Sequence, residues 1–106
     1  MGATPLQVTV RERKMEALEM LLEAWANVNE LGDGEGMGWS PLHECMLHPH
    51  STGFMVTQLL HWGANRRLLG GNGLTPLQMA KMVRNYNGVR MMRSYNDEER
   101  GAGEGG

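Results

Sequence analysis

The sequence predicts an all-α solenoid made of three helix-turn-helix units. The stretch Gly-Trp-Ser-Pro-Leu-His at residues 38–43 recurs upstream as Gly-Ala-Thr-Pro-Leu-Gln at residues 2–7 and downstream as Gly-Leu-Thr-Pro-Leu-Gln at residues 73–78. The copies start 36 and then 35 residues apart, and self-similarity at such a period is typical of stacked supersecondary units. In each copy a Ser or Thr hydroxyl can accept from first-turn N–H groups, and proline occupies the first helical position. We therefore expect a helix to begin at each copy.

The first unit reads as two antiparallel helices. Residues 5–11 predict a short helix, and residues 15–24 predict a second one with Leu18, Leu21 and Leu22 on one face, at spacings of three and four. The opposite face of the second helix is rich in glutamate. That pattern is typical of a solvated helix surface, and an acidic partner-binding stripe is the alternative.

A glycine-rich segment, residues 30–39, connects the first unit to the second. A phosphate-binding loop would need a Gly-Lys-Ser/Thr ending after an apolar strand, and this segment has neither. We therefore expect an irregular, loosened connecting loop.

The second unit runs from Ser40 to Asn65, and the third begins at Thr75. Pro49 is expected to end the first helix of the second unit, because proline cannot continue a helix. The apolar positions of the following helix are Phe54, Val56, Leu59 and Leu60.

The three copies resemble the Thr-Pro-Leu-His-x-Ala signature of the ankyrin repeat, over roughly residues 2–93. The resemblance implies that His43 hydrogen-bonds the neighbouring turns and that Cys45 replaces a small alanine. Trp25 stands where the family has a glycine in the left-handed conformation, which is strained for a bulky residue. The second helix of the first unit is therefore expected either to run on or to end differently.

The expected domain covers residues 1–94, with units at about residues 2–34, 35–69 and 70–94, and residues 95–106 form a Gly-rich acidic tail expected to be disordered. Solenoid ends normally carry polar capping units, and only Met1 precedes the first unit. This start indicates either an excerpt of a longer array or an end covered by another molecule. The uncapped ends are also candidates for self-association.

The resemblance implies a binding scaffold rather than an enzyme. In the family, finger-like turns and the exposed sides of the first helices form a concave face. Carried over position by position, the finger residues are Met37, Trp39, Asn72 and Leu74, and the helix residues are Arg11, Glu12, Leu47, His48, Met82 and Val83. We call these ten positions the concave face. A protein or peptide partner is expected there, with Trp39 as the hot spot because tryptophan offers a large area and an N–H donor.

The alternative function is charge-driven binding of acidic ligands, nucleic acid included, through the third unit. The net charge is only −2, yet residues 66–93 carry six basic residues and no acidic one. Nucleic acid is disfavoured, because only Tyr86 and Tyr95 lie near this basic block to stack on bases.

Metal and catalytic sites are not predicted. His43, Cys45, His48 and His50 form a dense cluster, but their spacing matches no established zinc site. Cys45 is expected to be buried, whereas a nucleophilic cysteine needs an accessible thiolate. No cofactor is expected either.

The composition favours a cytoplasmic or nuclear protein. The longest apolar run falls far short of the roughly 20 residues that a membrane span needs, and no secretory leader is recognisable. The single cysteine cannot form an internal disulfide, which agrees with a reducing compartment.

Overall fold

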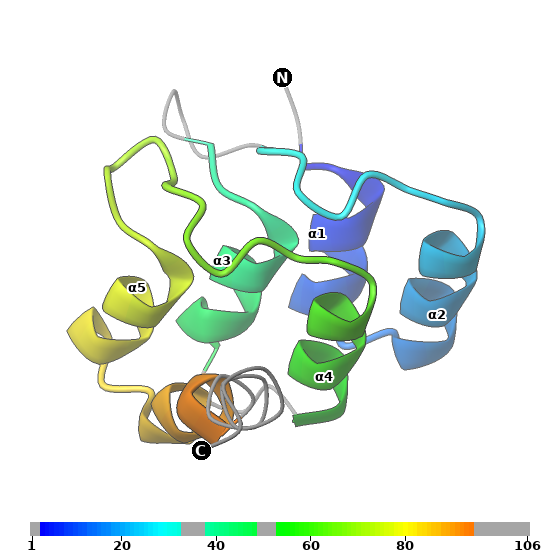
Figure 1. The fold of residues 1–106 in the computed structure, drawn as a ribbon. Helices are drawn as coiled ribbons and strands as arrows, with labels where there is room; N and C mark the ends of the chain where they lie inside the picture. The colour runs from blue at the N-terminus through cyan, green and yellow to red at the C-terminus, as the bar shows by residue number, and fades with distance from the viewer. Residues whose placement is uncertain (1–2, 33–37, 49–52, 95–106) are drawn as a thin grey trace, which may run out of the picture.

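The computed structural model describes residues 3–32, 38–48 and 53–94. Its helices are α1 (Pro5–Arg11), α2 (Met15–Glu23), α3 (Pro41–Leu47), α4 (Gly53–His61) and α5 (Pro76–Met82), followed by a last helix over residues 86–94. Between these helices, the residues that are described form only an isolated antiparallel bridge, which joins Gly32 to Trp39. The predicted all-α architecture is confirmed (Figure 1). The expected tail, residues 95–106, lies outside the described residues.

The three predicted helix starts are confirmed, and each is a complete capping box. Thr4, Ser40 and Thr75 each accept a hydrogen bond from the backbone N–H of the residue three positions on. The side chain of that third residue, which is Gln7, His43 or Gln78, accepts in return from the N–H of the cap. With proline at the first helical position, the local sequence satisfies the free N–H groups of every first helix.

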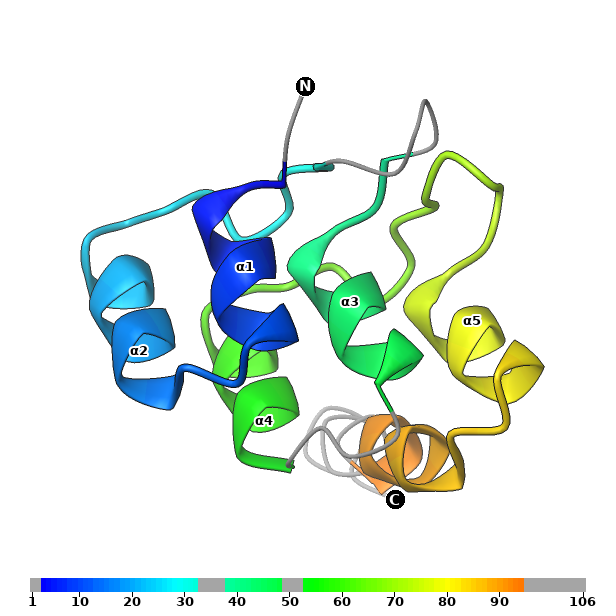
Figure 2. The same ribbon diagram turned by 180° about the vertical axis from the view of Figure 1, so that it is seen from behind.

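The first helices form one layer, in which α3 packs between α1 and α5 (Figures 1 and 2). Helices α2 and α4 contact each other and pack against this layer from the same side. The core between the layers includes Leu22, Leu59 and Leu60, all buried. Leu21, which the helical spacing puts on the same face as Leu22, is only partly buried and packs against this core.

Helix α2 ends at Glu23, so Trp25 does not prolong it. Trp25 adopts the left-handed conformation itself, with φ of 64°, and the N–H of Ala26 donates to Leu21 O at 3.0 Å. Helix α4 ends in the same way, with Gly63 at φ of 96°. For tryptophan this conformation costs about 1–2 kcal/mol. An edge-to-face contact between Trp25 and Trp62, with ring centroids 5.7 Å apart, offsets part of that cost.

The last helix departs from the regular pairing. It runs across the lower ends of α3 and α4 instead of lying alongside α5 as α2 lies alongside α1 (Figures 1 and 2). Asn85, just before this helix, is buried: its side chain accepts from Gly88 N at 3.0 Å and donates to Met46 O, at the end of α3, at 3.1 Å, so it joins the start of the last helix to α3. Lys14, which precedes α2 in the same way, makes no side-chain cap.

Candidate functional site

The helix residues of the concave face lie at the carboxyl ends of the three first helices. Arg11 and Glu12 close α1 and are exposed, and Leu47 and His48 close α3 and are half-buried. At the end of α5, the side chain of Met82 is 61% exposed and Val83 is half-buried. Because α1, α3 and α5 are packed in that order, these residues form a continuous row.

The finger residues of the concave face lie where the chain enters the first helices. Trp39 and Leu74 immediately precede the caps of α3 and α5 and are half-buried, and Asn72 is exposed. Met37 lies outside the described residues. The side chain of Asn72 accepts from the N–H of Leu74 at 3.1 Å, and the N–H of Gly71 donates to Gly38 O at 2.7 Å. The first bond holds the turn of the finger before α5, and the second joins that finger to the one before α3.

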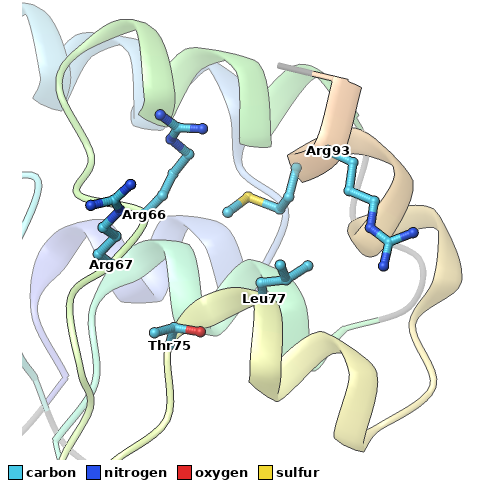
Figure 3. Close-up of a pocket in the computed structure, with 6 residues that line it drawn as sticks. Arg66, Arg67, Thr75, Leu77 and Arg93 are labelled. Carbon is cyan, nitrogen blue, oxygen red and sulfur yellow. The ribbon is translucent and has the colours of Figure 1, made fainter. Parts of the chain in front are cut away.

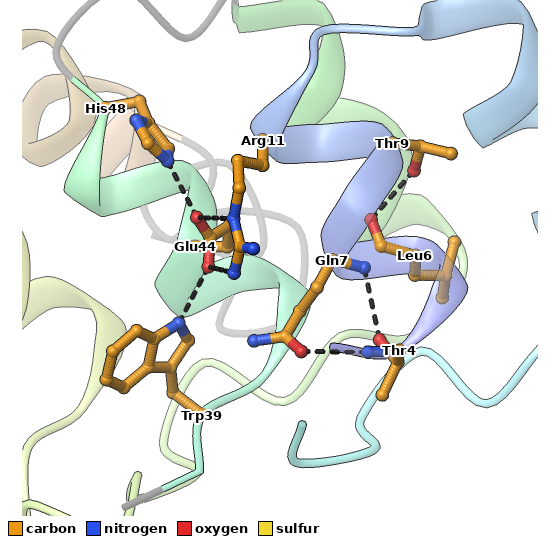
Figure 4. A network of polar contacts seen from close by, with 8 residues as sticks. All are labelled: Thr4, Leu6, Gln7, Thr9, Arg11, Trp39, Glu44 and His48. Atoms are coloured by element: carbon orange, nitrogen blue, oxygen red, sulfur yellow. Dashed lines mark hydrogen bonds and ion pairs between the residues drawn. The ribbon is translucent and has the colours of Figure 1, made fainter. Parts of the chain in front are cut away.

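Three of the ten predicted residues converge on a carboxylate, Glu44, in the first turn of α3 (Figure 4). Arg11 Nε lies 3.2 Å from Glu44 Oε2, and its Nη2 lies 3.4 Å from Oε1. Trp39 Nε1 donates to Glu44 Oε1 at 2.8 Å, and His48 Nε2 lies 2.7 Å from Oε2. We call Arg11, Trp39, Glu44 and His48 the Glu44 network. It ties α1, α3 and the finger before α3 into one unit.

The Glu44 side chain is only 3% exposed, so its charge depends on these donors. Burial by itself raises the pKa of the carboxyl, but the hydrogen bonds from Arg11, Trp39 and His48 outweigh that effect and hold the pKa below its ordinary value. Glu44 is therefore a carboxylate at neutral pH, and each of its oxygens has two donors.

The network changes what Trp39 can offer a partner. Its N–H, which the sequence suggested as a donor for a partner, is taken by Glu44 within the chain. Only the remaining surface of the half-buried ring is left for contact. Trp39 would therefore act as a fixed apolar surface.

His43 connects α3 to the finger before α5, as expected from the repeat. Its Nδ1 accepts from the N–H of Ser40 at 3.2 Å, which leaves the proton on Nε2, and Nε2 donates to Leu74 O at 2.8 Å. Burial lowers the pKa of His43, and the bond to Leu74 O only partly opposes this shift. The imidazole is therefore neutral at neutral pH and serves as a structural bridge.

Sequence analysis missed Glu44, although two signals were available. Glu44 and His48 are four residues apart on one helix, and Arg11 and Glu44 are 33 apart. The copies in these two units start 36 residues apart, so Arg11 and Glu44 lie in adjacent units at positions that are not equivalent. Neither signal shows that Glu44 is buried, which depends on how α1 packs against α3.

Two residues that the sequence offered as candidates for metal binding or catalysis, His43 and Cys45, are buried in the fold. Cys45 is fully buried, and burial raises the pKa of its thiol far above the ordinary value, so it is no thiolate nucleophile. His43 uses both ring nitrogens within the fold. His50 lies outside the described residues, and the part of the chain that is described holds no group of three or more His, Cys, Asp or Glu arranged for a metal ion.

Residues 1–33 match the family model of the ankyrin repeat. This stretch contains α1 and α2, and the two later units repeat its capped, proline-led helix start. Residues 1–33 are therefore an ankyrin repeat, and the helices of the described residues have the arrangement of an ankyrin solenoid. Ankyrin repeats are generally protein–protein interaction modules. No curated protein matches the chain. No helix among the residues described here is long and apolar enough to cross a membrane.

Proposed function

We propose that this chain is a protein-interaction scaffold that binds its partner through the concave face. The observation that carries the proposal is the Glu44 network, which holds Trp39 in place beside the row of helix ends. A surface that is fixed before binding loses little conformational entropy when a partner docks. Met82, Val83 and Leu74 supply further apolar area among the ten positions of the concave face.

The proposal assigns no catalytic step. Arg11 balances the charge of the buried carboxylate, and Trp39 and His48 complete its hydrogen bonds. Binding would then rest on shape and on apolar contact, with the exposed Arg11 and Glu12 at the rim.

A matched pair of methionines tests the face. Met82, on α5, is 61% exposed and Met20, on α2, is 68% exposed, but only Met82 belongs to the concave face. The full chain and its Met82→Glu and Met20→Glu variants would be used to capture proteins from cell lysate, with quantitative mass spectrometry. The proposal predicts proteins that are lost with Met82→Glu and kept with Met20→Glu.

Folding controls show whether a captured protein is lost because its binding surface changed or because the variant is unfolded. Circular dichroism and melting should be unchanged in both variants, because both side chains lie at the surface. Captured proteins that are lost with Met20→Glu and kept with Met82→Glu would contradict the proposal, since the partner would then contact the second helices.

Charge-driven binding by the third unit remains the second candidate. It is favoured by one observation, the convergence of three arginines on a single pocket.

A further inference from the structure

The crossing of the last helix leaves a pocket between α4 and α5. It has a volume of about 210 Å³ and is lined by Arg66, Arg67, Thr75, Leu77, Met92 and Arg93. In Figure 3 the last helix stands at one end of the space between α4 and α5, and the segment with Arg66 and Arg67 stands at the other. We call this space the arginine pocket. It shares no residue with the concave face.

The lining combines positive charge with an apolar wall. Arg67 and Arg93 are exposed and Arg66 is half-buried; Arg66 and Arg67 stand at one end of the pocket and Arg93 stands at the other (Figure 3). Between them lie Leu77, half-buried, and Met92, which is 3% exposed. Among the residues that the structure describes, the lining includes no acidic side chain, and residues 66–93 contain none.

This combination selects a particular ligand chemistry. A guanidinium group binds carboxylates in a planar, often bidentate geometry. Leu77 and Met92 favour an apolar group beside the anion, because burying it removes apolar surface from water. The volume is below the roughly 300 Å³ at which drug-sized ligand pockets begin, so it suits one or two side chains rather than a large cofactor.

We propose that the arginine pocket is a docking site for an acidic peptide segment of a partner protein, in which carboxylate side chains flank an apolar one. Charge complementarity carries the assignment to a peptide. Nucleic acid fits less well, because the part of the lining that the structure describes has no aromatic ring to stack on a base. The proposal is independent of binding at the concave face.

The test is a fluorescence anisotropy titration of the full chain with a labelled peptide of alternating glutamate and leucine. Two double variants remove the same charge from exposed positions within residues 66–93. R67Q/R93Q changes the pocket, and K81Q/R84Q changes basic residues that do not line it. We expect R67Q/R93Q to weaken binding about tenfold or more, since charge-assisted hydrogen bonds are lost, and K81Q/R84Q to change it less than about twofold.

A third variant addresses the apolar wall. Leu77→Ala should weaken the glutamate–leucine peptide but not a matched glutamate–serine peptide, which binds through charge alone. Circular dichroism would confirm that each variant is folded, and Leu77→Val is the substitute if Leu77→Ala is not.

Three results would overturn the proposal. Equal weakening by the two double variants would show that only the diffuse charge of the third unit attracts the peptide. Displacement of the peptide by an equimolar DNA duplex at physiological salt would identify the site as one for nucleic acid. Binding by a D97N/E98Q/E99Q variant, but not by the wild-type chain, would show that the chain's own acidic segment is the occupant.

Discussion

The concave face and the arginine pocket differ in whether a carboxylate of the same region lies beside their arginines. On the concave face, Arg11 meets Glu44, a carboxylate that is 3% exposed and held by Trp39 and His48 as well. In the arginine pocket, the part of the lining that the structure describes contains three arginines and no acid. The first region supplies the counter-charge of its arginine from within the chain, and the second holds Arg67 and Arg93 at the surface, where a ligand can reach them.

This difference suggests separate roles for the two regions. A carboxylate buried with its donors contributes order, because removing any partner leaves a polar group unsatisfied. Arginines at the surface contribute little to stability, because water solvates them and salt screens them. The Glu44 network should therefore control the stability and shape of the concave face, whereas the arginine pocket should affect ligand binding alone.

Removing the central carboxylate should have the largest effect. Glu44→Ala leaves Arg11, Trp39 and His48 without their acceptor and opens space beside α3, so the free energy of unfolding should fall by about 3 kcal/mol. The measurement is urea denaturation followed by circular dichroism. Glu12→Ala is the control, and its exposed side chain should matter by less than about 0.5 kcal/mol. Similar losses for the two variants would show that the network is not structural.

Removing one arginine from each region compares how much the two regions contribute to stability. Arg11→Ala takes away the cation of Glu44 and should cost about 1–2 kcal/mol, because the buried carboxylate loses two hydrogen bonds. Arg93→Ala should change stability by less than about 0.5 kcal/mol, since its side chain is exposed. If Arg93→Ala cost as much as Arg11→Ala, the two regions would not differ in the proposed way.

A smaller change isolates the indole donor. Trp39→Phe keeps an aromatic ring but removes the N–H that bonds Glu44 at 2.8 Å, and it should cost about 1 kcal/mol. In the Glu44→Ala background the same substitution should cost less, because the acceptor is already gone. The network would be contradicted if the losses in the free energy of unfolding caused by Trp39→Phe and Glu44→Ala were additive in the double variant.

Acid should weaken the network and leave the arginine pocket unchanged. The pKa of Glu44 is lower in the folded chain than in the unfolded chain, where it is about 4.3. Its contribution to stability is therefore complete above that value and is lost as pH falls through the folded-state pKa. Urea midpoints measured between neutral pH and about pH 3 should fall less steeply for Glu44→Gln than for the wild-type chain. Parallel curves would argue against a charged Glu44 in the fold.

Features set by neighbouring residues were predictable from the sequence. The three helix starts follow from a cap, a proline and a residue three positions on, all within six residues. The role of His43 also followed from its place in the repeat. The sequence does not decide the end of α2, because local chemistry disfavours a left-handed Trp25 and the repeat favours it. The structure shows the left-handed conformation of the repeat.

Features set by packing between units were not predictable in the same way. Arg11, Trp39 and His48 were identified as surface positions, but their convergence on Glu44 requires α1 beside α3. The basic block was evident in composition, yet only Arg66, Arg67 and Arg93 reach the pocket. Their convergence depends on the direction of the last helix, whose start Asn85 joins to α3 through a bond to Met46 O.

The central claim is that a protein partner binds the concave face, and methionine-methyl NMR tests it most directly. The full chain, labelled at its methionine methyl groups, would be titrated with the partner identified by capture. Met82 and Met20 are similarly exposed, at 61% and 68%, so each reports on its own surface. The account predicts that the Met82 resonance shifts or broadens in proportion to bound partner while the Met20 resonance stays in place. A Met20 resonance that moves while that of Met82 does not would contradict it.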